Sequence, residues 1–274
     1  MSLFHAFAIV VGCVAVAVVA ILLVRRHAPD GSYFHDGDRA SGVFGVLATG
    51  FAVLLGLVVV LAFTSFDESR SGAETEALLV SQQYETAQFL PPAQRDDLGG
   101  ELVCYARNVV HQEWPRLDDG TEGNAVNPWA VQLFQTIRKV DPKTPSEQAA
   151  YSKWLDQTSD REAARNDRMH GAAGVIPPPL WVVLLFSAVV IFGYMLLFAD
   201  SNEPWFVQAT LVGSVTAVMV ASLLLISVLD NPFSSHAGGL QPVAMKRTLV
   251  VLAQEQAVAS DGSVPCDTEG LPVG

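Results

Sequence analysis

Four stretches of the sequence carry no charge, and each is long enough to form a helix that crosses a bilayer. They contain no Asp, Glu, Lys, Arg or His and span residues 6–24, 43–65, 180–199 and 205–229. A helix needs about 20 apolar residues to cross the hydrocarbon core. Backbone amides in that core have no water to bind, so such stretches cross it as helices. The pattern predicts an all-α membrane protein with four transmembrane helices.

The spacing of these stretches predicts two hairpins of transmembrane helices. A turn-rich loop joins the first two helices, and only residues 200–204 separate the last two. The chain is therefore expected to comprise a first transmembrane hairpin (1–65), a helical soluble insert (66–179), a second transmembrane hairpin (180–230) and a C-terminal tail (231–274).

The insert has helical spacing throughout. Apolar positions recur at intervals of three and four, which places them on one helix face. The second transmembrane helix is expected to continue beyond the bilayer, because Ala73, Ala77, Val80, Tyr84 and Ala87 follow this spacing. Three further helices are indicated by Leu98, Leu102, Tyr105 and Val109, by Trp129, Leu133, Ile137 and Val140, and by Tyr151, Trp154 and Leu155. The second helix of the insert is expected to end near Trp114-Pro115. Thr144 and Glu147 in "TPSE" form a capping box at the start of the last helix.

The distribution of Lys and Arg gives conflicting signals on orientation. Arg25 and Arg26 directly follow the first helix and favour a cytoplasmic loop there. That loop would place the insert and both termini outside the cytoplasm of a bacterial plasma membrane. Basic residues of the insert and tail, among them Arg70 and Arg247, favour the opposite orientation. The first helix usually dominates, so an external insert is favoured.

Composition excludes several classes of function. The net charge of −12 argues against a nucleic-acid partner, which needs a basic face. No ionisable residue lies within the four apolar stretches, which disfavours proton-coupled transport and haem binding. No phosphate-binding loop, nucleophile motif or metal-ligand pattern is present, so neither enzyme activity nor a cofactor or metal is predicted. His111 and Glu113 are two residues apart and point to different helix faces, which indicates a solvated histidine beside a packed Trp114.

Two groups of residues could act on ions. Arg161, Arg165 and Arg168 share one face of the last insert helix. They form either an electropositive rim that attracts anions to a pore mouth, or a solvated face paired with nearby carboxylates. Leu55, Val59 and Phe63 recur every four residues on the second transmembrane helix, which also carries Gly42, Gly45, Gly50 and Gly56. They form either a hydrophobic pore neck or ordinary packing and lipid-facing surface.

Cys104 and Cys266 lie in polar segments on the same predicted side of the membrane. They form a disulfide if that side is oxidising, and otherwise they are two unrelated thiols.

Five short motifs occur in the same order as in a known family. They are "LLGLVVVLAFTSFDESRSGAETEA", "YETAQFLPPAQRDDL", "EWP", "PPLWVVLL" and "LDNPFSS". The chain resembles, from about residue 43 to 245, the bacterial bestrophin-like membrane proteins. That family is catalogued as a domain of unknown function and is distantly related to the bestrophin anion channels.

The resemblance implies a homo-oligomeric passive anion channel in the lipid bilayer, with an apolar neck on the second transmembrane helix. It points to Leu55, Val59 and Phe63 as the neck. It also points to Asn231, Pro232 and Phe233 as the anchor of a tail that grips the neighbouring subunit. Calcium-gated bestrophins carry an acidic cluster after this step, but "SSHAGG" follows here, so no Ca²⁺ site is expected.

A different class of function stays open beside the channel. The acidic helical insert could dock onto a membrane partner complex, which would make the protein a non-conducting accessory or scaffold subunit. A face of the second transmembrane helix that is buried around a symmetry axis would favour the channel. The same face exposed to lipid would favour the scaffold.

Overall fold

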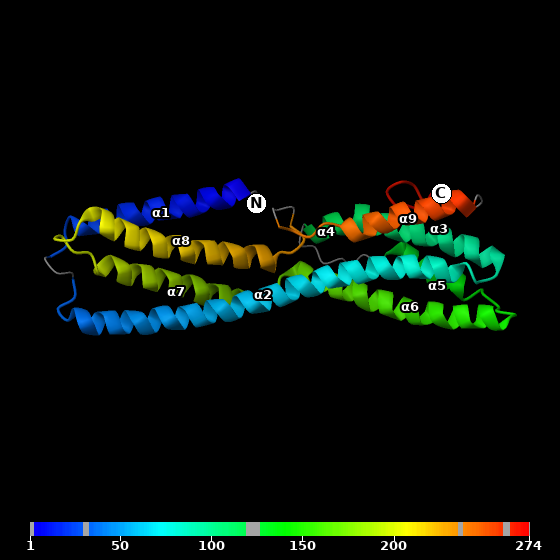
Figure 1. Cartoon of the computed structure of the whole chain (residues 1–274), viewed down its shortest axis with the longest axis horizontal. Helices are drawn as coiled ribbons and strands as arrows, with labels where there is room; N and C mark the ends of the chain where they lie inside the picture. Colours follow the sequence, from blue (N-terminus) through cyan, green and yellow to red (C-terminus); the bar gives the residue numbers. More distant parts are fainter. Residues whose placement is uncertain (1–2, 30–32, 119–126, 235–237, 260–263, 274) are drawn as a thin grey trace. The chain divides into compact units, whose positions relative to one another are not determined.

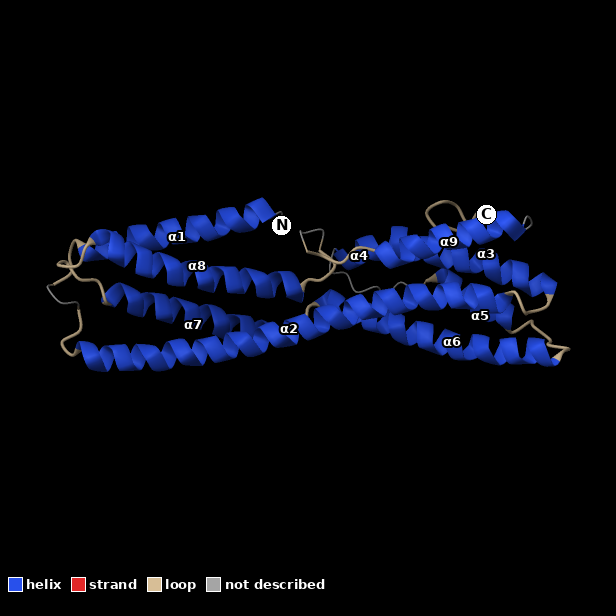
Figure 2. Ribbon diagram, in the orientation of Figure 1, coloured by secondary structure: helices blue, strands red, loops and turns tan. Residues whose placement is uncertain are grey.

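The computed structural model describes residues 3–29, 33–118, 127–234, 238–259 and 264–273. Within these residues the regular structure is helical, and a single isolated bridge pairs Cys266 with Pro272 (Figure 2). The elements are α1 (Leu3–Arg25), α2 (Gly37–Ala87), α3 (Pro92–Asn108), a π-helical turn (Val109–Glu113), α4 (Trp114–Asp118), α5 (Pro128–Ile137), α6 (Pro145–His170), a 3-10 turn (Gly171–Ala173), α7 (Pro178–Leu197), α8 (Trp205–Asp230) and α9 (Val243–Ala259). The predicted all-α fold class is confirmed. Residues 235–237 of the "SSHAGG" stretch lie outside the described residues.

Four of the described helices, α1, α2, α7 and α8, are long and apolar enough to cross a membrane. They coincide with the four uncharged stretches of the sequence. α2 has 51 residues, far more than the bilayer requires, and it runs without a break (Figure 1). The expectation that the second apolar helix continues well beyond its uncharged stretch is therefore confirmed.

The described chain divides into two compact units, and α2 contributes to both. One unit contains residues 1–64 and 174–230, with α1, α7, α8 and the first part of α2. The other contains residues 65–173 and most of the tail from residue 239 onward. We call them the membrane-helix unit and the polar unit. The tail groups with the helices of the polar unit.

In the membrane-helix unit, the first apolar helix packs against the last one. α1 packs closely against α8, which lies alongside it in Figure 1. At this contact a Cβ built on Gly213 would lie 3.4 Å from Val14 and 3.6 Å from Val18. These are ordinary van der Waals distances, so α1 and α8 are in direct contact here. The expectation of two sequential hairpins stays a prediction.

Arg25, one of the two arginines used to infer orientation, also has a local structural role. Its guanidinium donates to the backbone oxygens of Asp200 at 3.2 Å, Ser201 at 3.0 Å and Glu203 at 2.6 Å. These carbonyls belong to the α7–α8 loop, so Arg25 ties the end of α1 to that loop. It donates to carbonyl groups just beyond the end of a helix, where backbone acceptors need partners from outside the helix.

Asp230, the last residue of α8, fixes the entry to α7. Its Oδ1 accepts hydrogen bonds from the backbone N–H groups of Val175 at 2.8 Å and Ile176 at 2.9 Å. Its Oδ2 accepts from the indole Nε1 of Trp181 at 3.2 Å. Gly174, just before this turn, has a φ of 75°, which favours glycine. A buried carboxylate thus satisfies three donors between the two helices.

Replacing Asp230 with alanine is expected to lower the free energy of unfolding by about 1–3 kcal/mol, because the buried amide of Ile176 and the partly buried amide of Val175 lose their acceptor. The midpoint of thermal unfolding in detergent measures the effect. Thr210→Val is the control, since the Thr210 hydroxyl donates only to the carbonyl of Phe206 on an exposed face. Equal midpoints for the two variants would show that the Asp230 contacts do not support the fold.

The core of the polar unit is built from the faces that the spacing predicted. Ala77, Val80, Tyr84 and Ala87 of α2 pack with Leu98, Leu102, Tyr105 and Val109 of α3 and its π turn, and with Trp129, Leu133, Ile137 and Val140. Leu155 is the exception among the named core positions, because it is 41% exposed. The capping box of Thr144 and Glu147 is present at the start of α6. The unit is thus held by apolar helix faces with defined ends.

The second helix of the insert, which begins as α3, does not end near Trp114-Pro115 as expected. The chain widens into the π turn of Val109–Glu113 and continues as α4 to Asp118. The backbone N–H of Trp114 bonds to the carbonyl of Val109, five residues back. Pro115 has no N–H to offer, and a widened turn just before it lets the helix continue.

Candidate functional site

The neck candidates lie at the margin of the packed face of α2. Leu55 and Val59 are partly buried against the core of the membrane-helix unit, whereas Phe63 is 56% exposed. Gly42, Gly45, Gly50 and Gly56 are also open, since a Cβ built on any of them would meet no described atom within 4 Å. In a single protomer, part of α2 is therefore an apolar surface interrupted by glycines, with nothing from the described chain covering it.

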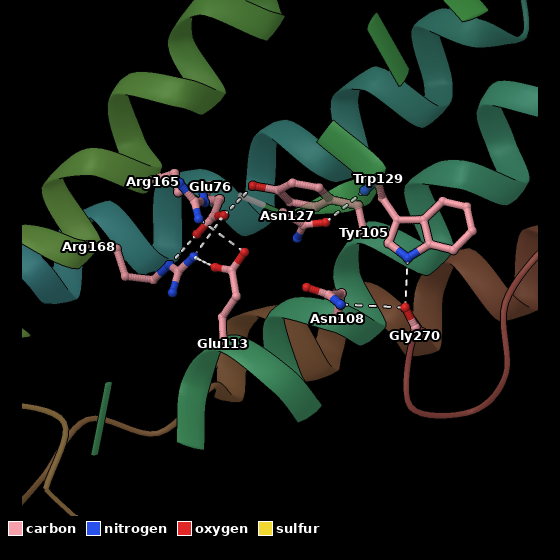
Figure 3. A network of polar contacts seen from close by, with 9 residues as sticks. All are labelled: Glu76, Tyr105, Asn108, Glu113, Asn127, Trp129, Arg165, Arg168 and Gly270. Atoms are coloured by element: carbon pink, nitrogen blue, oxygen red, sulfur yellow. Dashed lines mark hydrogen bonds and ion pairs between the residues drawn. The ribbon is translucent and has the colours of Figure 1, made fainter. Parts of the chain in front are cut away.

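A cluster of buried charges lies in the polar unit and joins α2, the π turn and α6 (Figure 3). Arg168 is at its centre and is completely buried. Its Nε lies 2.5 Å from Oε2 of Glu76, and its Nη2 lies 3.2 Å from Oε1 of the same carboxylate. The Nη2 also lies 2.5 Å from Oε2 of Glu113, whose Oε1 accepts from Arg165 at 3.3 Å. We call these four side chains the buried ion-pair cluster.

Two aromatic side chains, Tyr105 and Trp114, contact the cluster. The hydroxyl of Tyr105 donates to Oε1 of Glu76 at 2.5 Å. The guanidinium carbon of Arg161 lies 4.7 Å from the centre of the Tyr105 ring, and that of Arg168 lies 5.6 Å from the Trp114 ring. Such cation–π contacts strengthen when water is excluded.

The π turn brings Glu113 into this cluster. Glu113 is buried, while His111 is exposed. His111 is therefore solvated beside a buried Trp114, as the sequence indicated. The carboxylate of Glu113 was not expected to be buried, because the π turn re-aims it in a way that regular helical spacing does not predict.

The expectation of an exposed arginine face on α6 is corrected by the burial of these side chains. Arg161 is 1% exposed, Arg168 is fully buried, and the side chain of Arg165 is 18% exposed. The same face of α6 carries Trp154, Gln157 and Ala164, which pack inward. The three arginines therefore form neither a rim of free charge nor a solvated face.

The ion pairs shift the pKa values of Glu113 and Arg168. Burial alone would raise the pKa of Glu113, but the Arg168 and Arg165 guanidiniums outweigh it, and the pKa lies below its ordinary value. Burial alone would lower the pKa of Arg168, but Glu76 and Glu113 outweigh it and raise that pKa. Burial and the Glu76 carboxylate raise the pKa of Tyr105 well above its ordinary value, so its hydroxyl remains a donor. Glu113 and Arg168 are therefore both ionised at neutral pH.

This shift predicts how stability depends on pH. A lowered folded-state pKa means that Glu113 contributes stability above its unfolded-state pKa and loses it as the pH falls through the folded value. The difference in thermal midpoint between wild type and Glu113→Gln should therefore be largest near neutral pH and shrink towards about pH 3. Melting curves across that range measure it. A difference that stays constant with pH would contradict the ion pairing.

The tail step Asn231-Pro232-Phe233 packs against the same part of the polar unit. Phe233 is 2% exposed, and its ring meets the Trp114 ring edge-on at 5.3 Å. The indole Nε1 of Trp114 donates to the carbonyl of Leu240 at 3.2 Å. Pro232 is buried and Asn231 is exposed. Phe233 of this step therefore packs against the polar unit of its own protomer.

A disulfide and two hydrogen bonds hold the end of the tail. Cys104 and Cys266 form a disulfide with their Cα atoms 5.7 Å apart. The indole Nε1 of Trp129 donates to the carbonyl of Gly270 at 2.7 Å, and the Asn108 amide donates to the same oxygen at 3.5 Å (Figure 3). Gly270 has a φ of 80°, and a Cβ there would lie 2.4 Å from the backbone nitrogen of Asn108. Only glycine fits this close approach.

Among the described residues, no group of three or more His, Cys, Asp or Glu side chains is placed to hold a metal ion. The carboxylates of the buried ion-pair cluster are occupied by guanidiniums. The chemistry of this cluster is thus that of a fixed, dry electrostatic contact between helices.

Comparisons with known proteins agree on the fold. A sequence model of the bestrophin-like domain matches residues 11–237. A point variant of a bacterial bestrophin homologue from Klebsiella pneumoniae has a similar structure, with a TM-score of 0.69 and 14% identity over 89% of this chain and 98% of that one. A second point variant gives a TM-score of 0.64 and 16% identity over 91% and 98%. No curated protein matches the sequence.

Proposed function

The chain belongs to the bestrophin-like family, and on that premise we propose that it forms a passive anion channel as a homo-oligomer. Copies of α2 would surround the pore, with Leu55, Val59 and Phe63 at an apolar neck. The observation that carries the proposal is the open apolar face of α2, where Phe63 is 56% exposed and a Cβ built on any of the four glycines would meet no described atom within 4 Å. An apolar constriction of this kind gates by dewetting.

The four uncharged stretches support passive conduction over coupled transport. Coupled transporters use ionisable side chains within the membrane to bind protons or ions. None of the apolar windows contains one. A pore of this type would let anions pass down their gradient without a proton relay.

We also propose that the polar unit lies outside the cytoplasm, on the outer side of a bacterial plasma membrane. The disulfide between Cys104 and Cys266 supports this orientation. Disulfides persist in oxidising compartments such as the periplasm and are rare in the cytosol. The arginines that follow α1 favour the same orientation.

Chloride flux from liposomes that contain the purified protein tests the channel. Wild-type protein should release chloride, and Phe63→Asp should reduce that release because a ring of carboxylates repels anions. Phe63→Leu is the matched control, since it keeps the site apolar and should retain most of the flux.

Either of two results would reject the role of α2. Phe63→Asp could conduct chloride like wild type, which would place the conduction path elsewhere. Folded, oligomeric wild-type protein could also give no flux above empty liposomes. The second result would favour the scaffold subunit, whose acidic polar unit docks onto a membrane partner complex.

A further inference from the structure

A cavity of about 240 Å³ lies between α5 and α6 in the polar unit. Its lining includes aliphatic and aromatic side chains together with one cation: Leu133, Phe134 and Ile137 from α5, and Trp154, Leu155 and Arg161 from α6. An apolar cavity with a few fixed polar groups is the usual form of a small-molecule site. Nothing in the proposed channel function requires this cavity.

Arg161 is the unusual member of this lining. It is 1% exposed, yet it forms no ion pair with any described residue. Its Nη1 donates to Oε1 of Gln83 at 2.7 Å, and its guanidinium stacks on Tyr105. A guanidinium carries five N–H donors. Burying a cation without an anion is costly, so the site is electrostatically incomplete.

The buried ion-pair cluster does not balance the charge of Arg161. The buried ion-pair cluster contains two arginines, Arg165 and Arg168, and two carboxylates, Glu76 and Glu113. Those four charges cancel. Arg161 therefore adds one positive charge to a buried region, beside a cavity that is lined mainly by apolar side chains.

Arg161 is also held in place before any ligand arrives. The amide of Gln83 accepts from Arg161 and donates through Nε2 to Oγ1 of Thr158 at 2.9 Å. The Thr158 hydroxyl in turn donates to the carbonyl of Trp154 at 2.9 Å. Gln83 itself is fully buried. Such a fixed donor lowers the ordering cost of binding an anion.

From these observations we infer that the cavity binds a small organic monocarboxylate. Its carboxylate would pair with Arg161, and its apolar body would contact Phe134 and Leu155, the apolar lining side chains that are exposed. The lining favours this class over chloride, because an inorganic ion would leave the apolar walls without a partner. The inference is independent of whether the protein conducts ions.

Glu162 sets the charge that the site accepts. It lines the same cavity and is exposed. Its carboxylate would repel a second negative charge on a ligand, so dicarboxylates should bind more weakly than monocarboxylates.

The experiment measures the thermal midpoint of the full-length protein in detergent during titration with sodium benzoate, with sodium chloride at equal ionic strength as reference. A ligand that binds only the folded state raises the midpoint saturably. Benzoate should do so, chloride should not, and phthalate should require higher concentrations than benzoate.

Three variants localise the effect. Leu155→Glu adds a negative charge to the lining at a side chain that is 41% exposed, and it should abolish the benzoate shift. Glu162→Gln should lower the benzoate concentration for half-saturation by about three- to tenfold, and that for phthalate by more. Asp156→Asn, an exposed position of α6 outside the lining, should leave binding unchanged.

The inference is overturned if benzoate gives no saturable shift, if chloride gives the same shift, or if Leu155→Glu binds benzoate like wild type. Arg161→Lys tests the guanidinium directly and should weaken binding at least tenfold. Should that variant fail to fold, Leu155→Glu and Glu162→Gln still decide the question, because both change side chains outside the packed core.

Discussion

Replacing Arg168 with methionine should lower the free energy of unfolding by about 3–5 kcal/mol, because buried Glu76 loses the cation with which it pairs and buried Glu113 keeps only Arg165. Glu76 and Arg168 are completely buried, so water cannot replace the lost partner. Both oxygens of Glu76 and one of Glu113 accept from this guanidinium. The thermal midpoint in detergent and the yield of folded protein measure the loss.

Arg70→Met is the matched control on an exposed helix face. Arg70 pairs with Glu74 four residues later, and both side chains are 60% exposed. Exposed pairs of this kind contribute about 0.3–0.5 kcal/mol. A triple variant, Arg168→Met with Glu76→Gln and Glu113→Gln, should recover much of the stability lost in Arg168→Met. Equal losses in Arg70→Met and Arg168→Met would show that the cluster is not buried as described.

Removing the disulfide should have an effect of similar size. The bridge joins residues 162 positions apart, so it restricts a long loop in the unfolded chain. Loss of such a bridge typically costs about 2–5 kcal/mol. Cys104→Ser with Cys266→Ser should therefore lower the thermal midpoint strongly, and a reducing agent should produce the same shift in the wild type.

Cys13→Ala is the control for the cysteine experiments, since Cys13 is a free thiol in α1. Its midpoint should stay close to that of wild type and should still fall when reductant is added. A wild-type protein whose midpoint ignores reductant, and whose double serine variant melts normally, would contradict the bridge.

Local periodicity was sufficient to find the helices, because each helix presents one apolar face to a core. The spacing of Ala73, Ala77, Val80 and Tyr84 predicted the buried face of α2 beyond its uncharged stretch. The same spacing contained an unused signal for the ion-pair cluster. Glu76 lies three residues after Ala73 and four before Val80, so it is a charge on a predicted buried face. A charge in that position needs a buried partner.

Other features could not be read from one sequence. The partner of Glu76 lies 92 residues away on α6, and helix spacing does not say which distant face it meets. Arg161, Arg165 and Arg168 look like a solvated face because charges usually are solvated. The packing of α1 against α8 could not be predicted either, because uniform apolar runs do not encode which helices pair. The family resemblance, by contrast, rested on five ordered motifs and is confirmed by the domain match.

The most direct test of the proposed anion channel is the reversal potential of the reconstituted protein in a planar bilayer with unequal sodium chloride on the two sides. We expect currents that reverse near the equilibrium potential of chloride, because the apolar neck would pass anions down their gradient. Currents that reverse near the sodium potential, or a folded oligomer that carries no current, would contradict the account.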